Sequence, residues 1–232
     1  MDCSSLGDKL RDLLHLRLSS VAILFQQSAP EGVDRVSDAA ASGCAYWKLA
    51  GNGRVLYTEA SDHFNCTIGA YTHNVALPED KSKELEEMVG TMVQLDYITM
   101  GEVQELPRRT ESFGVAVYSP LEKSICEPDV VIVRGNAKQI MLVAEAARAA
   151  GVGDQGAAMG RPTCAMIPQA MQTSHGTTSL GCIGNRVYTE LADDELYFVI
   201  PGEQIEAVVG KLDRIVRANE QLETMHRERC GG

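Results

Sequence analysis

Short apolar runs alternate with amphipathic stretches along this chain, and this alternation limits the fold more than any other feature. The continuous apolar runs at 21–25 and 130–133 are bounded by turn residues, so they predict buried strands. Residues 113–118 and 195–200 predict two further strands, and residues 54–57 predict a shorter one. Amphipathic helices, with apolar residues every three or four positions, are predicted at 5–16, 79–100, 137–150 and 205–222.

These elements predict one α/β domain over residues 1–232, a compact mixed sheet with flanking helices. The strand at 130–133 and the helix after it, capped by Asn136, have the order of half a βαβ unit. Ser4 or Ser5 is expected to cap the first helix, and the polar tail at 223–232 is expected to be frayed. Two similar halves, about 18–110 and 111–222, are a further hypothesis, because each contains an apolar strand followed by two cysteines.

Charge and hydropathy exclude several classes of protein. The formal net charge is −11 at pH 7, which argues against nonspecific binding to nucleic acid or to an anionic membrane surface. No apolar run approaches the roughly 18 residues that a membrane helix needs. The first residues lack the basic-then-apolar plan of a secretory signal, so we expect a cytoplasmic location, where thiols are normally reduced.

The chain has seven cysteines, and in a reducing compartment these indicate metal ligands, reactive thiols or buried small residues before disulfides. Cys3 and Cys230 lie near the two ends, and Cys126 is expected to pack in front of a strand. Four thiolates suit both zinc and a cubane iron–sulfur cluster. The sequence has no CxxC pair, so spacing alone leaves metal binding and simple packing both open. The four interior cysteines are Cys44, Cys66, Cys164 and Cys182.

Glycines stand close to several of these cysteines. Gly69 follows Cys66 by three positions, and Gly181 and Gly184 flank Cys182. Glycine lets backbone N–H groups approach a sulfur, and such contacts stabilise thiolates bound to zinc or to a cluster. Gly69, Gly181 and Gly184 are therefore candidate cofactor-binding positions.

Three histidines, His63, His73 and His175, lie close in sequence to the interior cysteines. Imidazole titrates near neutral pH, so His63 and His175 are candidate proton donors, with a hydrogen-bonded structural histidine as the alternative. Arg186 could clamp a carboxylate or a phosphate, or it could form a structural bridge to a nearby aspartate.

Other motifs carry little. Residues 151–156 match the dinucleotide fingerprint GxGxxG, but they follow a helix instead of a strand, so they predict a flexible connection. There is no phosphate-binding loop, no HExxH and no GxSxG, so zincin-type peptidases and α/β-hydrolases have no support. A metal-free thiol enzyme with a Cys–His pair stays open.

The residues from Pro120 to Lys123 and from Glu127 to Ala137 resemble the central signature of a family called domain of unknown function 169, found largely in anaerobic prokaryotes. The resemblance extends over about residues 6–215. It implies that four cysteines form one metal or cluster site and leaves Cys3, Cys126 and Cys230 outside it. The other marks of the resemblance are Ser20 to Ile23, Cys44, Cys66 with Gly69, Cys164, and the run Gly181 to Arg186.

The sequence and the resemblance together favour a cytoplasmic 4Fe-4S protein with redox or cluster-assisted chemistry in an anaerobic metabolism. An enzyme of this kind would be an iron–sulfur oxidoreductase or a lyase, and its partner a small-molecule substrate or a redox protein. A structural zinc module without turnover and a metal-free thiol enzyme are the alternatives. The long helix at 205–222 is also compatible with a homo-oligomer.

Overall fold

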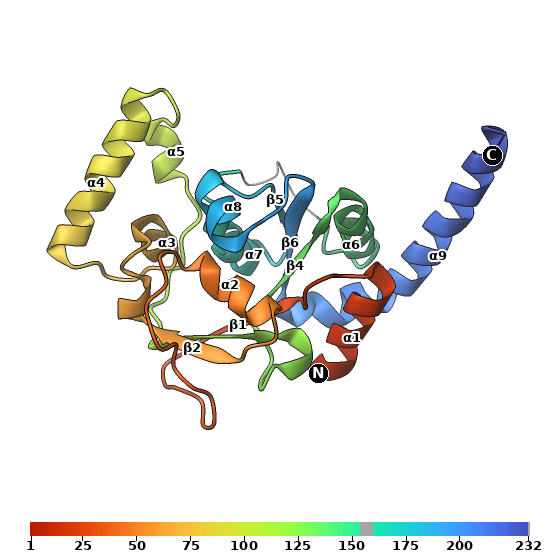
Figure 1. Ribbon diagram of the computed structural model, residues 1–232, viewed down its shortest axis with the longest axis horizontal. Helices are drawn as coiled ribbons and strands as arrows, with labels where there is room; N and C mark the ends of the chain where they lie inside the picture. Colours follow the sequence, from red (N-terminus) through yellow and green to blue (C-terminus); the bar gives the residue numbers. More distant parts are fainter. Residues whose placement is uncertain (154–159, 232) are drawn as a thin grey trace.

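The computed structural model describes residues 1–153 and 160–231, and within them six strands form one sheet (Figure 1). Their order across the sheet is β2-β3-β1-β4-β6-β5. The five predicted strands and the α/β class are confirmed, whereas the three-residue β5 is too short for a sequence pattern. The strands are β1 (Val21–Gln26), β2 (Leu56–Glu59), β3 (Val115–Pro120), β4 (Val130–Asn136), β5 (Thr177–Ser179) and β6 (Glu195–Pro201).

Every pairing between these described strands is antiparallel, where the sequence analysis expected a mixed sheet. The reason lies after β4. The chain continues through α6 (Ala137–Ala149), but the next strand to pair with β4 is β6, which runs antiparallel along all seven residues of β4. No parallel strand therefore completes a βαβ unit in the described part of the chain.

Both faces of the sheet are covered, so the domain has three layers. On one face Ala22, Val131 and Phe198 pack against α1 (Cys3–Leu14), α6 and α9 (Ile205–Arg229). On the other face alternate residues, among them Ile23 and Ile132, pack against α2 (Cys44–Gly51) and α7 (Met166–Thr173). This alternation follows from the two-residue period of a strand.

The second face carries short helices that the sequence did not predict. Besides α2 and α7 these are α3 (Thr67–Thr72) and α8 (Ile183–Thr189). Each has six to eight residues, which is about two turns. Helices of this length show no sustained apolar stripe in the sequence. Short 3-10 turns connect the elements at η1 (Ala60–His63), η2 (Leu121–Lys123), η3 (Thr163–Ala165) and η4 (Gly202–Gln204).

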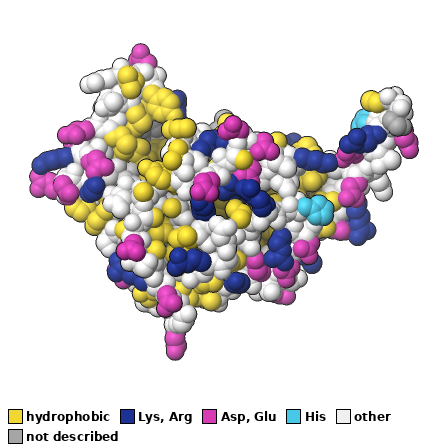
Figure 2. All heavy atoms as spheres, viewed as in Figure 1, with side chains coloured by type: hydrophobic (Ala, Val, Ile, Leu, Met, Phe, Trp, Pro, Cys, Tyr) yellow, Lys and Arg dark blue, Asp and Glu magenta, His cyan; other side chains and the backbone are white. Residues whose placement is uncertain are grey.

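A helical arm formed by α4 (Glu79–Gln94) and α5 (Met100–Gln104) extends from this layer (Figure 1). The predicted helix at 79–100 is thus confirmed, with its end at Gln94. None of the described residues of either helix is buried, so the apolar stripe of α4 does not join the core. Hydrophobic side chains gather over this arm in Figure 2.

The two chain ends differ from expectation in two places. Asp2, and not Ser4 or Ser5, caps α1, because its carboxylate accepts from the Ser5 N–H at 3.1 Å. Residues 223–229 were expected to be frayed, but α9 continues through Arg229. Ion pairs from Glu223 to Lys138 and Arg227 support these last turns.

Two further expectations can be placed. Asn136 caps α6 as predicted, and its side chain accepts from the Gln139 N–H at 3.0 Å. Cys126 is exposed and not packed, because it lies in the loop between η2 and β4. Of the GxGxxG match, residues 154–156 lie outside the described residues.

The proposed halves, 18–110 and 111–222, share one sheet, with β3 of the second half between β1 and β2 of the first. Their origin by duplication stays a prediction. Among the helices described, none combines the length and the hydrophobicity needed to cross a bilayer.

Candidate functional site

The four cysteines that the sequence singled out all lie where a helix begins. Cys44 is the first residue of α2, and Cys66 and Cys182 are the N-cap residues of α3 and α8. Cys164 lies in η3, which leads directly into α7. The first backbone N–H groups of a helix have no partner inside it, and a helix start favours a thiolate over a thiol. Each of the four cysteines therefore lies at or beside the start of a helix.

The four thiols also lie close enough to affect one another. The Ser42 hydroxyl is 3.1 Å from the Cys44 Sγ and 3.5 Å from the Cys66 Sγ. Charge on Cys164 is coupled to Cys44, Cys66 and Cys182, so residues from four separate segments share one neighbourhood. Within residues 1–153 and 160–231, however, no three Cys, His, Asp or Glu side chains already form a group that could hold a metal ion.

The electrostatics of this neighbourhood disfavour bare thiolates. Burial, with smaller effects of the neighbouring Cys66 and Cys182, raises the pKa of Cys44 to about 11, although the Ser42 hydroxyl acts in the opposite direction. Burial also raises the pKa of Cys164 well above its ordinary value, again with the other three cysteines adding to the effect. A bound cation reverses this situation, because its positive charge stabilises the deprotonated ligands and releases their protons.

Polar groups stand next to the sulfurs. Asn185 of α8 is 2% exposed and lowers the pKa of Cys44, yet neither polar atom of its amide has a hydrogen-bond partner of good geometry in the part of the chain that the structure describes. The Thr72 hydroxyl similarly lowers the pKa of Cys164. An unpaired buried amide costs free energy, and the sulfurs of a metal thiolate accept hydrogen bonds. The Asn185 amide and the Thr72 hydroxyl therefore lie where they act on these thiols.

Two of the three candidate glycines are required by their surroundings. A Cβ at Gly69 would lie 2.9 Å from the Cys66 Sγ, so the sulfur occupies the space that a side chain would need. Gly181 has a φ of +78°, and a Cβ there would lie 2.5 Å from Leu191. At Gly184 a Cβ would make only an ordinary contact with Tyr188, at 3.7 Å.

His63 of η1 and His73, which follows α3, form a buried pair with ring centroids 6.4 Å apart. Burial lowers the pKa of His63 to about 3 and that of His73 to about 4. The His63 Nε2 is 2.8 Å from the Thr58 hydroxyl, and the His73 Nδ1 is 2.8 Å from the carbonyl of Gly69. Both imidazoles are therefore neutral near pH 7, and His73 lies next to the glycine that contacts Cys66.

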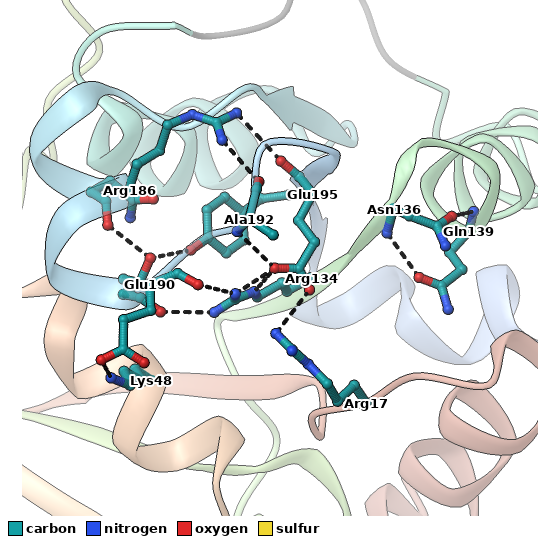
Figure 3. A network of polar contacts seen from close by, with 12 residues as sticks. Arg17, Lys48, Arg134, Asn136, Gln139, Arg186, Glu190, Ala192 and Glu195 are labelled. Carbon is teal, nitrogen blue, oxygen red and sulfur yellow. Dashed lines mark hydrogen bonds and ion pairs between the residues drawn. The ribbon is translucent and has the colours of Figure 1, made fainter.

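The other two predicted catalytic residues hold local structure. The His175 ring and backbone N–H both bond to Thr173, which closes the turn between α7 and β5. The Arg186 guanidinium donates to the carbonyl of Ala192 at 2.9 Å (Figure 3). It also donates to the carbonyl of Leu180 at 2.6 Å. An anion clamp at Arg186 stays a prediction, and it would require these bonds to break.

Sequence reasoning missed a buried cation near the site. Arg109 is 9% exposed, and its guanidinium lies 4.0 Å from the centre of the Phe25 ring. Its backbone N–H donates to the Thr72 carbonyl at 2.9 Å, which ties its loop to α3. No motif surrounds Arg108 and Arg109 in the sequence, so nothing in the chain signals that one is exposed and the other buried.

The fold and the site together define a three-layer α/β protein with four cysteines at helix starts on one face of an antiparallel sheet. The sequence profile of one family, DUF169, matches residues 9–211, and its description reads uncharacterised ArCR. Because this match covers most of the chain, the protein belongs to that family. Neither a curated protein nor a solved structure matches it.

Proposed function

We propose that this protein binds a 4Fe-4S cluster through Cys44, Cys66, Cys164 and Cys182 and uses it in redox or small-molecule chemistry in the cytoplasm. The observation that carries the proposal is the convergence of four thiols from four separate chain segments, each at the start of a helix. Four thiolates are the ligand set of cubane clusters.

The groups around the sulfurs support the same conclusion. Hydrogen bonds to the sulfurs and local burial set the reduction potential of an iron–sulfur cluster. The Ser42 hydroxyl lies within hydrogen-bond distance of the Cys44 and Cys66 sulfurs, and burial surrounds Cys164. A bound cluster would supply one-electron transfer or, with one ligand displaced, a Lewis-acidic iron.

The surrounding residues define roles for a substrate or a redox partner protein. His63 holds its proton on a neutral ring, so it could donate an N–H hydrogen bond but not a positive charge near pH 7. His175 and Arg186 stay candidates for proton transfer and anion binding, after release from their present hydrogen bonds. An oxidoreductase or a lyase would use such groups to orient its substrate.

A metal-free thiol enzyme is less well supported by the same geometry. The nucleophile in thiol chemistry is the thiolate. Burial raises the pKa of Cys44 and Cys164, so both stay protonated at neutral pH unless a cation is bound.

Metal analysis tests the proposal directly. Protein purified without oxygen is expected to contain about four irons and four sulfides per chain and to absorb broadly near 400 nm. Zinc in a colourless protein would contradict the cluster and indicate a structural zinc site instead. Neither metal after reconstitution would leave the cysteines without the proposed role.

Single Cys→Ser variants assign the ligands. Replacement of Cys44, Cys66, Cys164 or Cys182 is expected to reduce iron content by at least half. Cys126→Ser serves as the control, because Cys126 is exposed in the loop before β4. Equal iron content in all five variants would contradict the ligand assignment.

A further inference from the structure

Arg109 is a buried arginine near the cysteine site, and it lacks an ion-pair partner among the described residues. Arg109 follows α5 and is 9% exposed, so its guanidinium is largely removed from water. Burial lowers its pKa, and the Coulomb effects of Asp129 and Glu111 only partly oppose this. A buried charge is costly unless it is paired and hydrogen-bonded.

Among the described residues, no carboxylate forms an ion pair with this guanidinium. Its Nη1 donates to the Met171 Sδ at 3.3 Å, and a thioether is a weak acceptor. Its Nε is buried without a hydrogen-bond partner among the described residues. The rings of Phe25 and Phe113 lie 4.0 and 5.6 Å from it, which compensates for part of the lost hydration. The Asp129 Oδ2 accepts from the Phe25 N–H at 2.7 Å, and this carboxylate acts on Arg109 through its charge without a direct ion pair.

Arg134 shows what a satisfied arginine looks like in the same molecule. Its side chain is 9% exposed, and it forms an ion pair with Glu195 (Figure 3). It also donates to the carbonyls of Thr189 and Glu190, at 2.9 and 2.6 Å. Burial is therefore similar for the two arginines, and the missing acceptors distinguish Arg109.

We propose that Arg109 anchors the carboxylate of a small organic acid, bound between the aromatic side chains and the cysteine site. The Met171 sulfur marks the position that a carboxylate oxygen would take, and methionine is flexible enough to move aside. A guanidinium matches a carboxylate with two parallel hydrogen bonds. Phe25 and Phe113 would contact the apolar part of an aromatic acid.

Contacts connect this anchor to the cysteines. The Arg109 backbone bonds to Thr72, whose hydroxyl acts on the Cys164 thiol. Met171 and Cys164 pack against the same hydrophobic core. The assignment names a substrate class for the cysteine site and in that respect rests on the proposed function. The binding step itself uses only side chains of this chain.

Calorimetric titration of the full chain with sodium benzoate and sodium acetate, at constant ionic strength set by sodium chloride, tests the proposal. Saturable binding of either carboxylate is expected, and Arg109→Gln should weaken it by at least about tenfold. Arg109→Lys keeps the positive charge but loses the paired N–H donors of the guanidinium, so its affinity for the carboxylate should lie between those of the wild type and Arg109→Gln. Arg108→Gln is the matched control, since Arg108 is exposed and lies over Tyr71.

The outcomes separate the proposals. Absence of saturable carboxylate binding in the wild type, or equal affinity in Arg109→Gln, would overturn the anchor, and so would saturable binding of inorganic phosphate alone. If Arg109→Gln does not fold, the carboxylate affinities of the wild type and Arg109→Lys decide whether Arg109 is the anchor. Carboxylate binding in a protein that takes up no iron would contradict only the cluster, and a loaded cluster without carboxylate binding would contradict only the anchor.

Discussion

The buried histidine pair predicts a steep loss of stability in mild acid. His63 and His73 are neutral in the folded chain, because burial lowers their pKa values to about 3 and about 4. In the unfolded chain both return to an ordinary value near 6.5. The unfolded state therefore binds more protons below pH 6.5, so stability falls as the pH decreases through that value.

The size of the effect follows from the two pKa values. Between pH 7 and pH 5 each histidine should lower the free energy of unfolding by about 2 kcal/mol, or about 4 kcal/mol together. The Coulomb effect of Asp62 on His63 acts in the opposite direction and is smaller than the effect of burial. A loss of this size is a large part of the 5–15 kcal/mol typical of a domain.

Urea unfolding of the reduced, chelator-treated chain at half-unit steps from pH 7 to pH 5 measures this loss. His63→Gln can still bond to Thr58 and should remove about 1 kcal/mol per pH unit from the slope. His226→Gln, on the exposed end of α9, is the control. An unchanged slope in His63→Gln would refute the reasoning, whatever the absolute stability of the variant.

Three further substitutions test other parts of the structure. Arg134→Met should destabilise the fold by about 3 kcal/mol in chemical denaturation, because Glu195 keeps a largely buried charge without its main partner. Tyr46→Phe should cost about 1–3 kcal/mol in the same assay, since the Ala40 N–H loses its acceptor and the bond to the Asp62 carbonyl is lost. Gly210→Ala should raise stability by about 0.5–1 kcal/mol, because open space surrounds this mid-helix position; a lower melting temperature would contradict that prediction.

The longer elements could be predicted because local chemistry determines them. The short apolar run at 130–133, bounded by turn residues, predicts a strand buried on both faces, and it forms the first part of β4. The Asn136 cap follows from a side-chain acceptor placed directly before a helical stripe. The predicted end of α9 at residue 222 was wrong, because the ion pair between Glu223 and Lys138 joins residues far apart in the chain.

The candidate site was predictable only in part. The chain pattern and its resemblance to a family singled out Cys44, Cys66, Cys164 and Cys182, but spacing could not show that each begins a helix. The close approach of Gly69 to the Cys66 sulfur agrees with its predicted role. Arg109 could not be found, because an arginine beside another arginine gives no local sign of burial.

By itself the sequence determined the α/β class, five of the six described strands, the long helices and the set of interior cysteines, because each depends on neighbours within a few residues. The tertiary structure alone decided the strand order, the antiparallel pairing, the meeting of the thiols and the burial of His63, His73 and Arg109. Those features depend on which distant segments exclude water from one another. Hydrophobic packing and desolvation act through space, and a one-dimensional pattern does not record them.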